Sequence, residues 1–202
     1  MVGAIKMKRF LLSGLLVLAL FNGAWALPQP QEQVETMINS VLDVLQQTEL
    51  SSVERKELVS GRVQRFLNVT SMSQRTLGSY WQGATEEQRQ RFAGLFVKVL
   101  EGTYLNRIGD YSGGEVQYLK QRVKGNKAII DTKIVTEDLV VPVQYKMIFD
   151  NDSWQVFDVV IEGVSLIRNY RASYGEIIRK DGYDGLFALM EQKVIDLNGP
   201  PR

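Results

Sequence analysis

Tyr145 and Asp158 are the residues of this sequence best suited to chemistry. The chain has no histidine and no cysteine, which excludes Ser-His-Asp and Cys-His catalysis and most zinc sites. If Asn151 and Asp152 form a two-residue hairpin turn, Tyr145 faces Asp158 across neighbouring strands. One interpretation is an acid-base site in which Asp158 transfers a proton and Tyr145 polarises a carbonyl. The other is a structural pair that anchors the sheet, because buried polar groups are usually paired.

Arg168 and Arg171 form a second candidate, for binding rather than catalysis. Both fall on a predicted helix, and either guanidinium could donate charge-assisted hydrogen bonds to a phosphate at the mouth of a cavity. Such arginines more often form solvated ion pairs that contribute little to stability. No pattern in the sequence indicates a metal site or a cofactor.

The first half of the predicted domain, which helps to position these residues, has the pattern of helices. Apolar residues recur at three- and four-residue spacing from Val34 to Leu45. Capping boxes that begin at Ser51 and Thr85 open two further helices. The sequence therefore predicts helices over 34–45, 51–68, 71–80 and 85–104, with a hinge over 109–114.

Strands linked by tight turns follow the helical half. They predict a twisted four-stranded antiparallel meander, with strands over 116–124, 127–136, 139–149 and 153–162. The hairpin register would place Val143 opposite Val160 and Phe149 opposite Trp154. The residues predicted on the inward face are Leu119, Val123, Ile130, Ile134, Val143, Tyr145, Met147, Phe149, Trp154, Val156, Asp158 and Val160.

Glu162 and Gly163 lead from the last strand into a helix over 164–179, and a short helix follows from Asp184. The order of helices, meander and helices predicts an α+β fold with helices packed on one side of a curved sheet.

An apolar cavity between the sheet and the helices is the interpretation that the predicted buried side chains favour. Large, flexible or amphipathic side chains outnumber small ones there, and glycines such as Gly78 and Gly102 interrupt close packing. An ordinary packed core is the alternative. The residues expected to line the cavity are Met72, Leu77, Trp81, Phe96, Leu100, Tyr104, Val141, Val143, Tyr145, Met147, Val160, Val164, Ile167, Tyr170 and Tyr174.

The first 26 residues have the pattern of a secretory signal peptide. Three cations precede an apolar run from Phe10 to Leu20, and Ala24 and Ala26 are small residues at the cleavage positions. A membrane anchor is the alternative, but the run is shorter than the roughly 20 residues that span a bilayer. We therefore expect an exported chain whose residues 27–202 form one domain.

Charge and composition argue against nucleic-acid binding and against stabilisation by disulfides. Removal of residues 1–26 would leave 21 cations against 23 carboxylates, a net charge of −2. This balance does not favour nucleic-acid binding, and we find no basic stripe interleaved with aromatic residues. Without cysteine, an exported domain must be stabilised by core packing rather than by disulfides.

The run from Asp158 to Arg171, DVVIEGVSLIRNYR, resembles the MlaC or toluene-tolerance (Ttg2-type) family of periplasmic phospholipid carriers. Similar resemblances lie in Leu77 to Trp81, in the helix from Gln88 to Tyr104 with the Ala84-Thr85 start before it, and in the strand from Val141 to Tyr145. Together they cover nearly all of the chain after the predicted signal peptide, in the order found in the family.

The resemblance implies a soluble periplasmic shuttle that maintains the lipid asymmetry of the outer membrane. Its glycerophospholipid cargo would pass between an outer-membrane lipoprotein-porin complex and an inner-membrane ABC transporter with an MCE-domain subunit. It also implies an NTF2-like or cystatin-like shape that holds acyl tails inside, no cofactor other than cargo, and no catalysis; we expect a monomer. Two alternatives stay open: a small NTF2-like enzyme acting on an apolar substrate through Asp158 and Tyr145, and an interaction module with a packed core.

Overall fold

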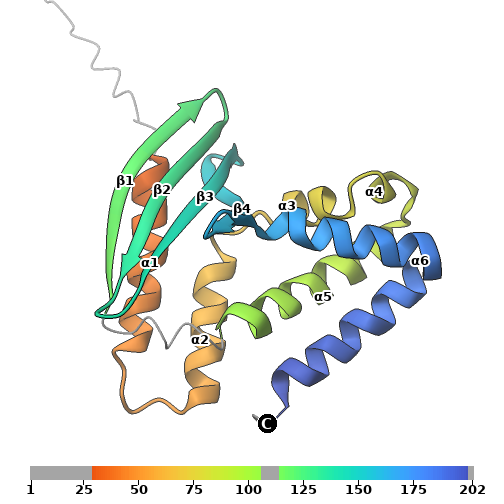
Figure 1. Ribbon diagram of the computed structural model, residues 1–202, viewed down its shortest axis with the longest axis horizontal. Helices are drawn as coiled ribbons and strands as arrows, with labels where there is room; N and C mark the ends of the chain where they lie inside the picture. The colour runs from red at the N-terminus through yellow and green to blue at the C-terminus, as the bar shows by residue number, and fades with distance from the viewer. Residues whose placement is uncertain (1–28, 106–113, 200–202) are drawn as a thin grey trace, which may run out of the picture.

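The computed structural model describes residues 29–105 and 114–199 (Figure 1). The predicted signal peptide and most of the predicted hinge lie outside the described residues. The elements in chain order are α1 (Pro30–Leu45), α2 (Ser52–Gln64), α3 (Val69–Leu77), α4 (Tyr80–Gly83), α5 (Glu86–Tyr104), β1 (Glu115–Lys124), β2 (Lys127–Val135), β3 (Val140–Asp150), β4 (Ser153–Ile161), β5 (Val164–Ser165) and α6 (Leu166–Asn198).

Local capping signals set the starts of the helices. The capping boxes predicted at Ser51 and Thr85 are both formed, so each side chain accepts a backbone N–H that would otherwise lack a partner. The predicted continuation of the second helix to Asn68 is wrong. The chain leaves α2 at Gln64, and the Asn68 side chain instead caps α3 by accepting from the backbone N–H of Ser71 at 2.9 Å.

The segment after α2 pairs with the sheet, which explains why the helix ends early. The backbone N–H of Val156 donates to the carbonyl of Phe66 at 2.8 Å, and the N–H of Asn68 donates to the carbonyl of Val156 at 2.9 Å. These two bonds satisfy backbone groups that a continued helix would have used internally. They also fasten the start of α3 to the middle of β4.

The sheet is antiparallel and has five strands in the order β1-β2-β3-β4-β5. The α+β class and the four meander strands agree with the prediction, but the strand count of four is wrong. Glu162 and Gly163, with φ of 50° and 83°, form a tight turn. This turn closes a hairpin with the short β5 before the chain enters α6, rather than leading directly into the helix.

A bulge in β4 changes the predicted register. Phe149 lies opposite Trp154 as predicted, but Phe157 has no partner in β3 because the register shifts there by one residue. The predicted pairings of Tyr145 with Asp158 and of Val143 with Val160 are therefore wrong. The pairs beyond the bulge are Lys146–Asp158, Tyr145–Val159, Gln144–Val160 and Val143–Ile161.

The edge strand β1 also departs from the predicted inward face. A register shift between Tyr118 and Lys120 leaves Leu119 out of the ladder, and its side chain is 59% exposed. Val123 lies beside the buried Ala128 near the end of the strand and is 49% exposed. Neither residue contributes to the core as predicted.

Two apolar layers result from this arrangement. In Figure 1, α1 lies along one face of the sheet, while α3, α5 and α6 pack together beside it. The first core joins α1 to β2, β3 and β4, and the second joins the three helices. The two helices predicted over 164–179 and from Asp184 are both present within α6, and the chain kinks sharply between them at Gly182, where φ is 70° and ψ is −171° (Figure 1).

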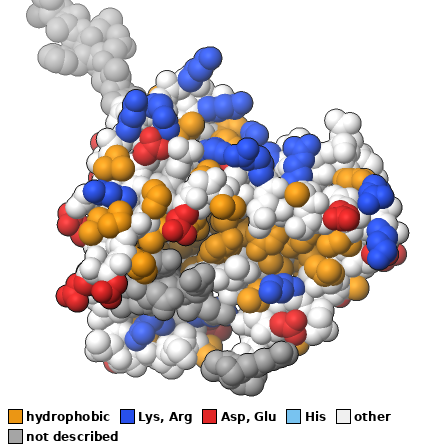
Figure 2. Space-filling model, in the orientation of Figure 1, with side chains coloured by type: hydrophobic (Ala, Val, Ile, Leu, Met, Phe, Trp, Pro, Cys, Tyr) orange, Lys and Arg blue, Asp and Glu red, His pale blue; other side chains and the backbone are white. Residues whose placement is uncertain are grey.

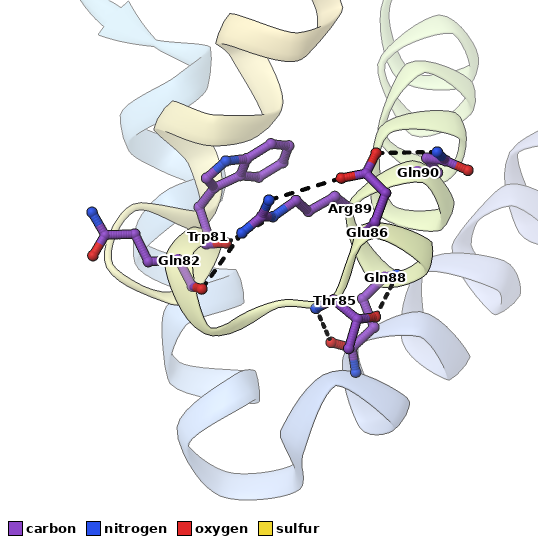
Figure 3. Close-up of polar contacts among 7 residues, drawn as sticks. All are labelled: Trp81, Gln82, Thr85, Glu86, Gln88, Arg89 and Gln90. Atoms are coloured by element: carbon purple, nitrogen blue, oxygen red, sulfur yellow. Dashed lines mark hydrogen bonds and ion pairs between the residues drawn. The ribbon is translucent and has the colours of Figure 1, made fainter.

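The corner between α4 and α5 fixes the direction in which α5 starts (Figure 3). The Arg89 side chain reaches back from α5, and its Nε donates to the carbonyl of Trp81 at 3.0 Å. The guanidinium also lies 5.2 Å from the centroid of the Trp81 ring, within the range of a cation–π contact. These contacts satisfy a backbone carbonyl of α4 and hold the two helices at this corner.

Candidate functional site

An apolar pocket of about 340 Å³ lies between the inner face of the sheet, α1 and the last turn of α5. In the space-filling view, hydrophobic side chains gather around a hollow near the middle of the molecule, between the sheet and the helices (Figure 2). The lining residues are Met37, Ile38, Val41, Leu42, Leu45, Val63, Leu67, Tyr104, Leu105, Gly114, Val116, Ile134, Val143, Tyr145, Val156, Val159, Ile161 and Glu162.

The β4 bulge decides which residues of that strand face the pocket. Successive side chains of a regular strand point to opposite faces, so a strand without the extra residue Phe157 would have turned Asp158 and Val160 inward. With the bulge, Val159 and Ile161 take those places. The bulge therefore removes a carboxylate from the inner face and replaces it with aliphatic side chains.

Helix α1 supplies the opposite wall through two adjacent rows of side chains. Val34, Met37, Val41 and Val44 are buried against the sheet and α2. A second row, beginning at Ile38, is only partly buried and faces the pocket. Sequence reasoning identified the apolar face of α1 but did not place it at the site. The width of this face gave no signal, because a broad apolar stripe is ordinary for any helix that packs on a core.

The residues that the sequence predicted as cavity lining fall into different parts of the structure. Tyr104, Val143 and Tyr145 lie in the pocket wall. Met147 belongs to the core between α1 and the sheet, Val141 is buried in β3, Val160 is partly buried in β4, and Val164 is 56% exposed in β5. The remaining ones belong to the helical core: Met72, Leu77, Phe96, Ile167 and Tyr174, with Trp81, Leu100 and Tyr170 packed against them.

The helical core is occupied by its own aromatic rings. Phe92 stacks on Phe96 with 5.4 Å between ring centroids, and Tyr174 meets Phe96 edge-on at 6.2 Å. Tyr170 also meets Phe96 edge-on at 5.4 Å. These are the offset and T-shaped geometries that aromatic pairs prefer.

Two tyrosine hydroxyls and one carboxylate are the main polar groups of the pocket. Burial, and to a smaller degree the nearby Tyr170, raises the pKa of Tyr104 to about 12. Burial also raises the pKa of Tyr145 above its ordinary value. Both phenols are therefore protonated near neutral pH and are able to donate hydrogen bonds. Glu162, at the β4–β5 turn, is the one charged side chain among the described lining residues.

Asp158 is a structural residue in this geometry. Its side chain is buried and accepts hydrogen bonds from Lys146 Nζ at 2.9 Å, Ser165 Oγ at 2.8 Å and the backbone N–H of Ile167 at 3.2 Å. Ser165 in turn caps α6. Asp158 thus ties the start of α6 to the sheet, and the Asp158–Tyr145 pair required by the enzymatic alternative is not assembled.

The two arginines considered for phosphate binding lie away from the pocket wall. Both side chains are exposed. The backbone N–H of Arg168 donates to the Ser165 cap. The Arg171 guanidinium lies against Gly78, where an added Cβ would come within 2.7 Å of its Nε. Gly78 has a φ of 58°, so this close approach and the backbone conformation both favour glycine there.

Neither a metal-binding cluster nor a membrane-crossing helix occurs in the described part of the chain. Within residues 29–105 and 114–199, no three acidic side chains come together as metal ligands would. No helix in these ranges is both long and apolar enough to cross a bilayer.

Comparisons with known proteins give a consistent result. The sequence model of the MlaC protein family matches residues 35–192. The chain is 28% identical over 133 residues to the intermembrane phospholipid transport system binding protein MlaC of Haemophilus influenzae, covering 63% of this chain and 62% of that protein. It is 26% identical over 107 residues to the toluene tolerance protein ttg2D of Pseudomonas putida, covering 52% and 50%. The matched part of the chain thus spans half to about two thirds of the length of these relatives.

The fold is also shared with a solved structure. A phospholipid-binding protein from Ralstonia solanacearum, solved in complex with a phospholipid, superposes with a TM-score of 0.79 and 21% identity. The superposition covers 85% of this chain and all of that one. Since the family match extends over more than three quarters of the sequence, from α1 to α6, the chain belongs to the MlaC family.

Proposed function

We propose that this chain is a phospholipid-binding transport protein that holds acyl chains in the pocket between α1 and the sheet. The observation that carries the proposal is the pocket wall, which is built almost wholly of aliphatic side chains from both sides. Family membership and the phospholipid bound by the Ralstonia structure support it.

The physical chemistry of the cargo explains why such a wall is sufficient. Each buried methylene contributes about 0.8 kcal/mol, so the tails of a diacyl lipid cost tens of kcal/mol to expose to water. The tails are already dry in a bilayer, and the pocket need only match that environment rather than improve on it. Shape and apolar surface then suffice, and few polar contacts are needed.

We also propose that the pocket widens as lipid enters. Its volume is near the lower end of the roughly 300–1,000 Å³ typical of small-molecule sites. In the described ranges, the backbone N–H of Gln31 and the side chain of Gln29, just before α1, bond to Gln121 of the sheet at 2.9 Å and 3.4 Å. Most of the other contacts between α1 and the sheet are apolar and therefore not directional, although Glu35 of α1 lies near Tyr118 of β1. Movement of α1 away from β2 and β3 would break few polar contacts.

The tyrosine hydroxyls and Glu162 would meet the polar part of the lipid. Tyr104 and Tyr145 are protonated and could donate to ester or phosphate oxygens. The catalytic alternative receives no support from this geometry, because Asp158 is committed to Lys146, Ser165 and the start of α6. We accordingly propose binding without turnover and without a cofactor.

The cellular setting follows from the same proposal. We propose that residues 1–26 direct export to the periplasm and that residues 27–202 act there as one domain and as a monomer. The cargo would pass between an outer-membrane lipoprotein-porin complex and an inner-membrane ABC transporter with an MCE-domain subunit. The name of the Haemophilus relative, an intermembrane phospholipid transport system binding protein, supports this setting.

Lipid extraction tests the proposal directly. Protein purified from a bacterial host without added lipid is extracted with organic solvent, and the extract is analysed by mass spectrometry. We expect phospholipid close to equimolar with protein. A small metabolite would instead favour an enzyme, and folded protein free of any lipid would contradict the proposal.

Two neighbouring residues give a matched pair of variants for the same assay. Val159 faces the pocket, whereas Val160 pairs with Gln144 on the other face of the sheet. Val159→Trp should fill the pocket and lower bound lipid at least tenfold, while Val160→Trp should retain it. If Val159→Trp does not fold, Ile161→Trp alters the same wall. Equal lipid retention by folded pocket and control variants would exclude this pocket as the site.

A further inference from the structure

The outer face of strands β1 and β2 carries a group of cations that we call the lysine face: Lys120, Arg122, Lys124, Lys127 and Lys133. The register places Lys124 opposite Lys127 and Arg122 opposite Ile129, so the alternate residues of both strands share one side. Their neighbours Ala128, Ile130 and Thr132 are buried on the other side. In Figure 2, Lys and Arg side chains gather at the end of the sheet where β1 and β2 join in Figure 1.

Little within the described structure neutralises the lysine face. Arg122 forms an ion pair with Asp131 at 2.8 Å. Asp131 also accepts from Gln144 at 2.7 Å. The four lysines form no ion pair or side-chain hydrogen bond with any residue of 29–105 or 114–199. Lys120, Lys124 and Lys127 are exposed, and Lys133 is partly buried.

The charge of this face opposes that of the remaining chain. Between Lys120 and Lys133 there are five cations and one carboxylate, whereas the rest of the described chain has 14 cations and 21 carboxylates. The compact basic surface on two adjacent strands is thus set against an excess of carboxylates in the rest of the described chain. Such a surface creates a local potential that the net charge does not reveal.

Protection of the sheet edge does not explain the whole group. Lysines on an edge strand discourage pairing with other chains, which fits Lys120 and Lys124 on β1. Lys127 and Lys133 lie on β2, which is covered on both sides by β1 and β3. Moreover, the directly opposed Lys124 and Lys127 repel each other and oppose folding. An external anion would relieve this repulsion.

We propose that the lysine face docks the protein on an anionic lipid bilayer. The cations are mostly lysines, which act as hydrated point charges and do not require the bidentate geometry through which arginine recognises specific groups. The face also lacks the exposed Trp and Tyr side chains that usually anchor protein interfaces. A flat, diffuse layer of negative headgroups matches these properties better than a protein partner does.

Docking in this way goes beyond lipid carriage and leaves the pocket free. The pocket lies on the inner face of the same sheet, where Ile134 and Val116 line it. A protein held by its outer face would keep that side turned away from the bilayer surface. The lysine face would therefore raise the concentration of the carrier at the membrane without itself taking up cargo.

Vesicle co-sedimentation tests the proposal with the whole chain after residue 26. Vesicles of equal parts phosphatidylglycerol and phosphatidylcholine are compared with vesicles of phosphatidylcholine alone. A lysine near an anionic surface contributes about fivefold in affinity, so the triple variant Lys120→Gln, Lys124→Gln and Lys127→Gln should bind at least tenfold more weakly. The matched control changes three exposed lysines elsewhere by the same net charge: Lys98→Gln, Lys180→Gln and Lys193→Gln.

The outcomes separate docking from cargo binding. The proposal predicts binding to phosphatidylglycerol vesicles that falls with rising salt, is lost in the first triple variant and is kept in the control, with extracted lipid unchanged in both. Failure of the unaltered protein to bind, equal loss in the two triples, or equal binding to phosphatidylcholine would overturn it. The proposal would also be refuted if the protein did not bind vesicles but bound an acidic protein through these lysines. Absence of extracted lipid from the folded, unaltered protein would instead count against the carrier function, whatever the vesicle result.

Discussion

The helical core and the pocket are both lined by apolar side chains, yet the core is filled and the pocket is hollow. In the helical core, rings from α5 and α6 stack or meet edge-on and occupy the space between the helices. In the pocket, the facing walls are mostly Val, Ile and Leu from α1 and the sheet. These side chains leave a space of about 340 Å³ unfilled, although Met37 of α1 and Val156 of β4 also belong to the core beside it.

The two regions also differ in how their walls are held. At Gly102 of α5, an added Cβ would lie 2.7 Å from Leu197 Cβ of α6, so the two helices approach closely. The start of α6 is fixed to β4 by the bonds of Asp158. Helix α1, by contrast, is held on the sheet mainly by apolar contacts. The helical region is therefore fixed by a close approach and by directional hydrogen bonds, whereas α1 is the wall that we propose moves when lipid enters.

The largest effect should come from removing a ring of the helical core. Phe96 is fully buried, and Phe96→Ala should lower the free energy of unfolding by about 3–5 kcal/mol, because it leaves a cavity. Leu42→Ala, in the pocket wall, should lower it far less, because Leu42 is only partly buried. Urea denaturation monitored by circular dichroism measures both. Equal losses would show that the two regions are packed alike.

A smaller loss of stability is expected on changing Asp158, which joins α6 of the helical core to the sheet. Asp158→Asn keeps the shape of the side chain but leaves Lys146 without its carboxylate, and should destabilise the fold by about 2–3 kcal/mol. Extracted lipid per folded molecule should stay the same. Asp131→Asn, which alters the more exposed partner of Arg122, should change stability by less than about 1 kcal/mol. A catalytic activity abolished by Asp158→Asn would refute the structural role.

The smallest change in stability is expected for alanine substitutions at two glycines of α5. Gly102→Ala would overpack the contact with Leu197 and should destabilise the protein by about 1–3 kcal/mol. Gly94 has open space around an added Cβ, so Gly94→Ala should be neutral or should stabilise by up to about 1 kcal/mol. Thermal denaturation of the two variants compares them. Equal effects of the two changes would show that the close approach at Gly102 does not set it apart from Gly94.

Local signals allowed much of the fold to be predicted from the sequence. The capping boxes at Ser51 and Thr85 and the turns that separate β1 to β4 depend on neighbouring residues alone. The β4 bulge could not be predicted, because Phe157 is not a glycine and no local pattern marks an extra residue. Its effect was large, since every side chain beyond it changed faces.

The pocket was harder to predict because its walls come from distant parts of the chain. The sequence pointed to an apolar interior beside the sheet and to Tyr104, Val143 and Tyr145, which lie in the wall. It could not reveal that α6 packs on α5 rather than on the inner sheet face, or that α1 takes that place. Both helices have apolar stripes, and tertiary packing decides between them.

A crystal structure of the lipid-loaded protein would show whether acyl chains lie between α1 and the sheet. We predict electron density for acyl chains between α1 and the sheet, in contact with Val143, Tyr145 and Val159, with the helical core unchanged. Acyl density among Phe96, Tyr170 and Tyr174, or a pocket closed by its own side chains while lipid binds elsewhere, would contradict the account.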